Sequence, residues 1–590
     1  MLGIMISSIQ LFPSVEILKY DTRSTGIDFE YSSSPSLAPY HMITMLVPNF
    51  FGTIIRNNYW SLFPFWQLAI YIGILPLVLC MFSLRQKNHF VLFFIAVIAF
   101  SLVFAFGKYT PFYYFLYKTI PFLNKFRAPT RMLFFYTFSL SLIAGFGAKF
   151  LLKSKPKDLF TKKVAIFLVF MAAFCAIAIA SSLLLKDNIL NLGEGILNAK
   201  YSRSHDQLSL GDISNYEKKI EGSYNEIVHG LIFLMIALLA ISLTFFLHAK
   251  KIINPRAFKF AILAIIITDL WFFSMPFIEA KSIGEIHAQK DIASFLAGID
   301  KPNFRVLDLA SALPQQTSIV YNIEQVGGYE PMILGYYREY ASEMAAIPYT
   351  SSTAIPIREV RRKQMLNLLN VKYMVSDKKL SDPSYELLYN KTVYIYDASG
   401  KKIYSDDSTS QGNLDFQGLS VNYVYKNTDA MPRATFVFSS KTAKREDMLE
   451  LMKSRDFNPR KEILLESEKR HDDNKYPILF GKNALHKNSQ AQISYYSPNK
   501  IIVEAKNQDD GFLLLSEVWY PGWRAFDNGK EIELFRADYL FRAVYLGKGS
   551  HKVEFVFDPP SYKIGKLMTM IGILIAMILF FINKRFKYIL

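Results

Sequence analysis

The stretch FVLFFIAVIAFSLVFAF, from Phe90 to Phe106, carries no charge and has Ser101 as its one polar residue. A run of this character favours a helix that crosses the hydrocarbon core of a membrane, which takes about 20 apolar residues. Six more stretches are similarly long and apolar, and each is bounded by charge or proline: Phe65–Leu84, Met132–Leu152, Val164–Leu185, Val228–Phe246, Ala257–Phe277 and Ile564–Ile582. Hydrophobic residues make up 51% of the 590-residue chain, so the sequence predicts a polytopic α-helical membrane protein with about seven full spans.

The chain begins with a shorter apolar stretch, MLGIMISSIQLF, which ends before Pro13. It is too short to cross a bilayer, and it lacks the basic first region of a signal peptide. We interpret it as the outer half of a helix and expect coding sequence for further spans upstream of Met1. A short interfacial anchor is the alternative.

Basic residues concentrate in every second connection between the apolar stretches. The links at Arg85 to Lys87, Lys153 to Lys163 and Lys250 to Lys259, with the tail after Ile582, hold fourteen Lys or Arg and one acid. Because Lys and Arg favour cytoplasmic loops, we place these links and the C-terminus in the cytoplasm. The net charge of +17 partly reflects this pattern, so we expect no nucleic-acid partner.

The remaining connections are predicted to lie on the extracytoplasmic side of the membrane, and the longest runs from residue 278 to 562. Its part from 278 to 485 mixes helix-like runs such as DIASFLAGI with strand-like runs such as VKYMVSD, which predicts an α+β domain. From 486 to 562, short β-branched and aromatic runs alternate with turns, as is typical of a small antiparallel β-sandwich. Asn528-Gly529 predicts a type I′ hairpin turn, and Pro559-Pro560 is expected to end the last strand. The other expected domains are a transmembrane helical domain at 1–277 and a final helix with a cytoplasmic tail at 563–590.

Several motifs are spread over the chain: IQLFPSVEILKYDTRS, LVPNFFG, YIGILPLVL, the segment from Phe104 to Gly147, LLNVKYMV, VYKNTDAMPRATFV and EVWYPGWRAFDNGKEIEL. Together they resemble the YfhO-like family of bacterial membrane proteins, which are thought to be glycosyltransferases of the GT-C type. The resemblance implies a GT-C-like fold in the bacterial cell (inner) membrane. Family members look longer at the N-terminus, and the outer loop there usually carries the catalytic aspartate in GT-C enzymes. The resemblance therefore places the main catalytic acid upstream of Met1.

A sugar transferase that works outside the membrane has no access to cytosolic nucleotide sugars. The expected donor is therefore a sugar on a polyprenyl phosphate, and the expected acceptor is a glycopolymer or lipid of the cell envelope. The sequence agrees, because it has no Walker A motif, no Rossmann glycine pattern and no Asp-x-Asp pair.

Two arginines are the predicted phosphate ligands. Arg127 and Arg131 precede the span that starts at Met132, and Pro129 is expected to keep the chain out of helix until that point. Arginine binds phosphate bidentately, so both guanidiniums are predicted to meet a lipid phosphate at headgroup depth. Anchoring in membrane lipid by interfacial cations is the alternative.

Carboxylates supply the other polar candidates. Asp269 lies inside an apolar span, where an ionisable group indicates either function or a structural partner on a neighbouring helix. Four acids follow the first apolar stretch, together with Arg23: Glu16, Asp21, Asp28 and Glu30. Any of them could act as a general base or hold a divalent cation, although most such loop charges are simply solvated. Asp28 and Glu30 are the weak catalytic candidates.

Aromatic residues of the expected sandwich are candidates for sugar stacking. Trp519, Tyr520 and Trp523 occur in VWYPGWRAF, and packing in the sandwich core is their alternative role. The stretch GGYEPMILGYYREY, from Gly327, suggests either a site-lining loop or a packed connection. Histidines show no metal-ligand spacing, so we predict no bound metal from them.

Two rival functions stay open from sequence alone. One is a non-catalytic envelope scaffold whose helices anchor an exterior carbohydrate- or protein-binding region. The other is a transporter of lipid-linked sugars, which would place polar or interrupted segments in several spans. Apart from Asp269 the spans are nearly uniform, which counts against a transporter.

Overall fold

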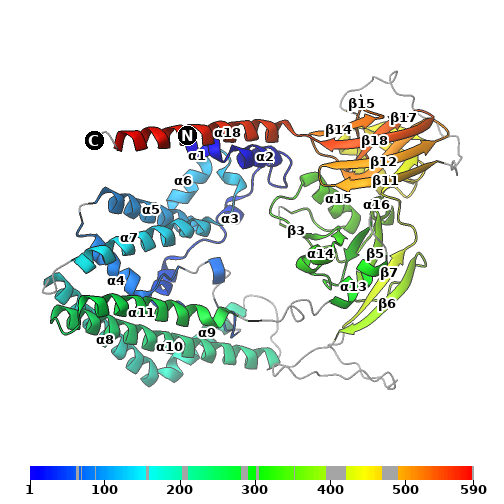
Figure 1. The fold of residues 1–590 in the computed structure, drawn as a ribbon. Helices are drawn as coiled ribbons and strands as arrows, with labels where there is room; N and C mark the ends of the chain where they lie inside the picture. Colours follow the sequence, from blue (N-terminus) through cyan, green and yellow to red (C-terminus); the bar gives the residue numbers. More distant parts are fainter. Residues whose placement is uncertain are drawn as a thin grey trace. The chain divides into compact units, whose positions relative to one another are not determined.

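A computed structural model gives the fold of the chain (Figure 1). It describes residues 1–56, 58–60, 65–67, 70–86, 88–153, 159–201, 210–278, 280, 290–299, 304–350, 353–393, 420–467 and 489–587. The chain divides into two compact units. The helical unit is Gly26–Ala280, and the sheet unit combines Met1–Thr25 with Lys281–Leu590.

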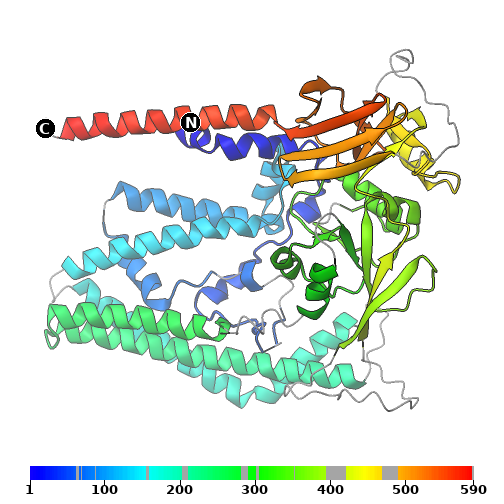
Figure 2. The same ribbon diagram turned by 45° about the vertical axis from the view of Figure 1, so that its right-hand side comes forward.

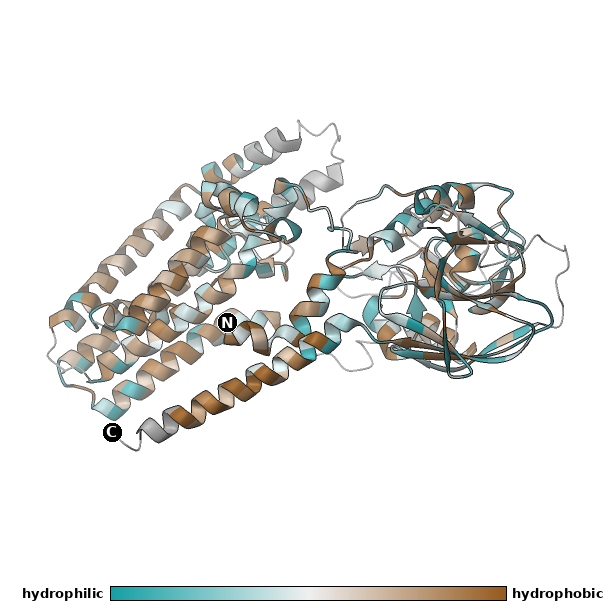
Figure 3. Cartoon of the chain, turned by 90° about the horizontal axis from the view of Figure 1, so that it is seen from above, coloured by the Kyte–Doolittle hydropathy of each residue, from teal (hydrophilic) through white to brown (hydrophobic). Residues whose placement is uncertain are grey.

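Long apolar helices build the helical unit. They are α4 (Ile74–Ser83), α5 (His89–Ala105), α7 (Leu133–Lys153), α8 (Leu159–Leu184), α10 (Leu210–Ala249) and α11 (Pro255–Ser274), with α3 (Phe29–Ser32), α6 (Pro111–Thr119) and α9 (Lys186–Tyr201) between them. Their buried faces share a core that includes Leu79, Phe82, Leu168 and Phe245. Figure 3 shows the long helices as mostly hydrophobic along their length.

Five described helices are long and apolar enough to cross a membrane, four of them in this unit and the fifth at the C-terminal end of the chain. They correspond to five of the seven expected spans, while α5, at His89–Ala105, is a shorter apolar helix at the position of a sixth. The expected span Phe65–Leu84 differs, because its regular helix begins only at Ile74. The structure thus supports a membrane protein with about five spanning helices, and the count of seven stays a prediction.

Glycine sets the closest approach of two helices in this unit. A Cβ atom at Gly147 of α7 would lie 1.8 Å from the Leu79 carbonyl oxygen of α4, whereas one at Gly145 would meet nothing within 4 Å. Membrane helices gain van der Waals contact where small residues let their backbones approach. Gly147 is therefore a packing requirement, and Gly145 is not.

Mixed secondary structure forms the first part of the sheet unit. A five-stranded sheet has the order β2-β1-β5-β7-β6 and is parallel at β1 with β2 and β5 but antiparallel at β7. Its strands are β1 (Arg305–Asp308), β2 (Glu324–Gln325), β5 (Val371–Ser376), β6 (Tyr385–Val393) and β7 (Ser420–Asn427). The helices of this part are α13 (Lys290–Ile299), α14 (Gln315–Tyr321), α15 (Gly335–Ala345) and α16 (Lys363–Leu368), and α17 (Arg445–Lys453) packs against α15. In addition, β3 (Gly328–Tyr329) pairs with β4 (Ala354–Ile355). This is the α+β character that the sequence predicts.

Two further sheets face each other as a β-sandwich. One has the order β8-β13-β17-β16-β10-β9 and the other β11-β12-β18-β14-β15. The strands are β8 (Ala434–Val437), β9 (Ser440–Ala443), β10 (Ile463–Glu466), β11 (Gln490–Ser497), β12 (Lys500–Asn507), β13 (Gly511–Val518), β14 (Trp523–Asp527), β15 (Lys530–Ile532), β16 (Phe535–Ala537), β17 (Phe541–Leu546) and β18 (Gly549–Phe557). Their inner faces bury a shared core that includes Val503, Leu513 and Phe555. Because β8, β9 and β10 precede residue 486, the sandwich begins earlier in the chain than the expected boundary.

Local turn chemistry in the sandwich matches the sequence. Asn528 and Gly529 connect β14 to β15 with φ angles of 49° and 85°, as a type I′ turn requires. The last strand ends at Phe557, and Pro560 opens α18 (Pro560–Lys587), the final apolar helix.

The first helices of the chain pack on this final helix. α1 (Leu2–Ile6) and α2 (Ser8–Ile17) run beside α18 in Figure 1 and in Figure 2. The Ile9 amide donates to Thr569 Oγ1 at 2.9 Å, and a Cβ at Gly565 would lie 2.5 Å from the Ser8 carbonyl oxygen. The opening stretch therefore forms part of the sheet unit, not of a separate membrane domain over 1–277.

Candidate functional site

Two loops of the helical unit fold together. We call them the loop platform, made of residues 26–36 and 107–131. The Phe29 ring contacts three tyrosines of α6 and lies edge-on to Tyr117 with 5.5 Å between ring centroids. The Tyr117 hydroxyl donates to the Ile27 carbonyl at 2.6 Å. The aromatic residues of the second loop therefore hold the first loop in place.

Arg127 is fixed on the loop platform by Tyr31. Its guanidinium carbon lies 4.5 Å from the Tyr31 ring centroid, and Nη1 donates to the Tyr31 hydroxyl at 2.9 Å. Tyr31 belongs to α3, where Asp28 Oδ1 accepts its amide at 2.8 Å as the N-cap. Asp28 thus has a structural task, and Glu30 is exposed on the same helical turn. A cation of the second loop thus contacts the short segment of the first loop that carries two carboxylates.

Arg131 lies at the entry to the next long helix. A 3-10 turn spans Pro129–Met132, and Ala128 before it has a φ of 65°. The α-helix α7 begins only at Leu133, in line with the expectation, but Pro129 already opens a 3-10 turn, where its missing N–H costs nothing. Arg131 is exposed and Arg127 is half-buried, and their convergence on one phosphate stays a prediction.

Asp269 caps a helix that starts inside an apolar stretch. One carboxylate oxygen accepts the Tyr71 hydroxyl, and the other accepts the Ile74 amide at 2.7 Å. Ile74 is the first residue of α4, and Gly73 before it has a φ of 97°. Unpaired backbone N–H groups are costly in lipid, so the carboxylate compensates for the late start of α4. These contacts fit the structural interpretation of Asp269.

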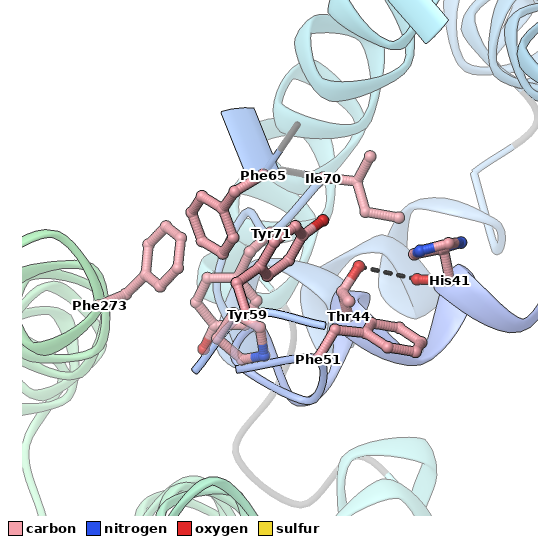
Figure 4. Close-up of a pocket in the computed structure, with 9 residues that line it drawn as sticks. His41, Thr44, Phe51, Tyr59, Phe65, Ile70, Tyr71 and Phe273 are labelled. Carbon is pink, nitrogen blue, oxygen red and sulfur yellow. Dashed lines mark hydrogen bonds between the residues drawn. The ribbon is translucent and has the colours of Figure 1, made fainter. Parts of the chain in front are cut away.

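A small aromatic pocket lies beside Tyr71 (Figure 4). Phe51, Phe65 and Phe273 contribute rings to its wall, and the Thr44 hydroxyl donates to a backbone carbonyl at 2.7 Å. Its volume of about 20 Å³ holds roughly one water molecule. It is therefore too small for a sugar ring.

The remaining loop acids belong to the sheet unit. Asp21 is buried, and its carboxylate accepts the Thr22 hydroxyl at 2.9 Å. Burial raises the pKa of Asp21, against the opposing effects of Thr22 and the Arg23 charge. The Thr22 amide also donates to the Ile333 carbonyl at 2.9 Å. The stretch from Gly327 is thus a packed connection that pairs with Asp21 and Thr22.

The three sandwich aromatics take different roles. Trp523 stacks on the Arg542 guanidinium at 3.8 Å, and Trp519 lies 5.2 Å from that of Arg536. Both indoles are therefore engaged in packing. Tyr520 instead lines a cleft and packs between Tyr20 and Phe557.

A cluster of buried charges in the sheet unit was not anticipated from the sequence. Glu517 Oε1 accepts from Arg305 Nη2 at 2.9 Å and from Arg433 Nε at 2.7 Å, while Arg542 Nη2 lies 3.7 Å from Oε2. Burial raises the pKa of Glu517, but the three positive charges outweigh this effect, and the net pKa is lowered. Arg433 also pairs with Glu324.

This charge cluster explains two of the quoted motifs. Arg433 comes from VYKNTDAMPRATFV and Glu517 from EVWYPGWRAFDNGKEIEL. A third motif, LLNVKYMV, joins them where Asn370 Nδ2 donates to the Met431 carbonyl at 2.8 Å. Opposite charges in separate motifs were the available signal, but their pairing depends on the fold. These motifs hold the first sheet against the sandwich.

Among the described residues, no group of three or more His, Cys, Asp or Glu side chains is arranged to hold a metal ion. The apolar helices and the sheets together define a multi-pass membrane protein with a large β-rich part.

Comparison with known proteins agrees with this class. Residues 481–569 match the family model described as bacterial membrane protein YfhO. A relative, the uncharacterized protein YfhO of Bacillus subtilis (strain 168), is 26% identical over 106 residues, which cover 18% of this chain. The matched part spans 12% of that relative's length. The chain is therefore a YfhO-like membrane protein, and no solved structure matches it.

Proposed function

We propose that this chain is a membrane glycosyltransferase that takes a sugar from a polyprenyl-phosphate donor. The acceptor is a glycopolymer or lipid of the cell envelope outside the cytoplasm. In this proposal residues 278–562 are extracytoplasmic, the C-terminus is cytoplasmic, and the loop platform faces the donor at the outer membrane surface. The YfhO-like match supports the class, because members of that family are thought to be glycosyltransferase-like.

The observation that supports this proposal most directly is the fixed position of Arg127. Its guanidinium is held by the ring and hydroxyl of Tyr31, and neither contact neutralises its charge. A cation that is already ordered loses less conformational entropy when it binds an anion. Arg131 follows four residues later and is exposed, so it is free to approach the same phosphate. Glu30 places a carboxylate on the segment that carries Tyr31, where an acceptor hydroxyl would need a base.

The test is binding of undecaprenyl phosphate to the full chain in nanodiscs of neutral phosphatidylcholine. A charge-assisted hydrogen bond contributes about 1.5–3 kcal/mol, so Arg127→Ala or Arg131→Ala should weaken binding roughly tenfold to a hundredfold. Arg127→Lys should restore binding only in part, because lysine keeps the charge but not the planar fork.

Lys118→Ala is the matched control. Lys118 is an exposed cation of α6 on the same loop platform, and its loss removes the same charge. An equal effect of Lys118→Ala would indicate general electrostatic attraction and refute the assignment. Folded variants with both arginines removed and parental affinity would make these residues interfacial anchors.

A further inference from the structure

The sheet unit contains a cleft with a volume of about 750 Å³. It opens where α2, the end of β18 and the start of α18 come together. This volume lies within the range of about 300–1,000 Å³ that is usual for small-ligand sites. Unlike the pocket beside Tyr71, it has room for a sugar.

Apolar side chains such as Ile17, Leu334 and Phe557 form most of the cleft lining, and its charged groups are acidic. Glu16 and Asp558 contribute carboxylates, Gln10 and Asn499 contribute amides, and Tyr520 and Tyr562 contribute aromatic rings. No Lys, Arg or His is among its described lining residues, although Lys563 next to the cleft pairs with Asp558 at 2.5 Å. Such a surface disfavours phosphates and acidic sugars.

Carboxylates, amides and tyrosines together suit a neutral sugar. Sugar hydroxyls donate to carboxylate oxygens, and amides both donate and accept. The C–H groups of a sugar ring present a weakly positive face, which is attracted to the negative face of an aromatic ring. Tyr520 is partly exposed, and its packing against Tyr20 and Phe557 fixes its orientation. Burial and the neighbouring Glu16 carboxylate raise the pKa of Tyr520, so the acid and the aromatic ring lie on the same wall of the cleft.

The position of the cleft points to a ligand at the membrane surface. Phe557 ends the last strand, and the apolar helix α18 begins at Pro560. Ser561 Oγ at the cleft is buried and has no hydrogen-bond partner among the described residues. The wall from Asn499 to Tyr562 falls inside the segment that matches the YfhO family model.

We propose that this cleft binds a neutral sugar unit of a membrane-attached glycan. Tyr520 and Tyr562 supply the aromatic contacts, and Glu16 and Asp558 accept hydrogen bonds from sugar hydroxyls. The role of the sugar as acceptor rests on the proposed function, whereas sugar binding itself does not.

The test measures binding of maltotriose and of tri-N-acetylchitotriose to the full chain in phosphatidylcholine nanodiscs without polyprenyl phosphate. Calorimetry gives the affinity, and saturation-transfer NMR identifies the contacted protons. We expect a dissociation constant of about 1 mM for at least one sugar, and weakening of about fivefold or more in Tyr520→Ala and Glu16→Gln. Tyr562→Ala tests the same wall at a side chain that is 47% exposed, so its folding is not at risk.

Matched controls lie on the same sandwich but outside the cleft. Tyr495 of β11 is 50% exposed, and Glu504 of β12 is also exposed, so Tyr495→Ala and Glu504→Gln should bind like the parent. Tyr520→Phe should retain the packing and lose only part of the affinity. Glucuronic acid, as an anionic probe, should not bind.

The inference is overturned if neither trisaccharide binds, or if both tyrosine-to-alanine variants of the cleft bind like the parent. It is also overturned if the controls weaken binding equally. The two proposals fail separately. Arg127→Ala should leave trisaccharide binding unchanged, and Tyr520→Ala should leave undecaprenyl phosphate binding unchanged.

Discussion

Replacing Glu517 should destabilise the sheet unit more than any replacement of an exposed charge. Glu517 Oε1 receives two charge-assisted hydrogen bonds, from Arg305 at 2.9 Å and Arg433 at 2.7 Å. Each such bond contributes about 1.5–3 kcal/mol, and breaking a buried ion pair from one side typically costs about 3–5 kcal/mol. Glu517→Gln keeps a neutral acceptor and should cost about 3 kcal/mol, while Glu517→Ala should cost about 5 kcal/mol.

Hydrogen exchange of the full chain measures this effect locally, which avoids a single unfolding constant for a protein of several parts. Amides of β13, at Gly511–Val518, should lose over a hundredfold of protection in Glu517→Gln, as expected from about 3 kcal/mol. Glu504→Gln, at an exposed position of β12, is the control and should change little. If the β13 amides of Glu517→Ala lose less than about tenfold of their protection, the reasoning is refuted, since three buried arginines would then tolerate the missing anion.

Glu517 also predicts how the stability of the folded state changes with pH. The folded pKa of Glu517 lies below its ordinary value of 4.5, so the folded state binds the proton less readily than the unfolded state. The stability that Glu517 contributes is fully present above pH 4.5 and is lost as the pH falls through the lowered pKa. On acidification below pH 4.5, the free energy of unfolding should therefore fall less in Glu517→Gln than in the parent.

Three more predictions concern single buried positions. Burial raises the pKa of Asp538 to about 7 from an ordinary 3.8, so its contribution to stability falls as the pH rises between these values; Asp538→Asn should remove that loss in melting curves at pH 5 and pH 8. Gly147→Ala should reduce the yield of folded protein in size-exclusion chromatography, whereas Gly145→Ala should match the parent. Asp269→Ala should lower the melting temperature, because the Ile74 amide loses its acceptor, and Asp269→Asn should restore part of it through its remaining amide oxygen; equal melting of Asp269→Ala and the parent would contradict the capping role.

Features that depend on neighbours in sequence could be predicted. The run from Phe90 to Phe106 predicts a helix, and His89–Ala105 is one. The Asn528-Gly529 turn and the strand end before Pro560 follow from local backbone preferences. Tertiary contacts override such preferences in the stretch Phe65–Leu84. Its helix begins late at Ile74, where Asp269 of another helix satisfies the free amide.

The candidate sites show the same limit. Arg127 could be singled out because its loop is predicted to lie outside the cytoplasm, where the positive-inside bias gives no reason for a cation. Its partner Tyr31 could not, because they are 96 residues apart and no local pattern links them. The Glu517 cluster draws on residues from Arg305 to Arg542, and each charge alone resembles an ordinary surface charge in the sequence.

The cleft depends on an even longer separation, and this explains why composition could not reveal it. Glu16 reaches Tyr520 only because α1 and α2 lie directly on α18, and that approach depends on two glycines of α18. A Cβ at Gly572 would lie 2.9 Å from that of Met5, just as one at Gly565 would contact the backbone of α2. Two small residues seven positions apart on one helix face thus bring an acid from one end of the chain to an aromatic ring near the other. The proposed sugar binding and the helix packing should therefore be lost together when Gly565 is enlarged, whereas Tyr520→Ala should weaken the binding and leave the packing unchanged.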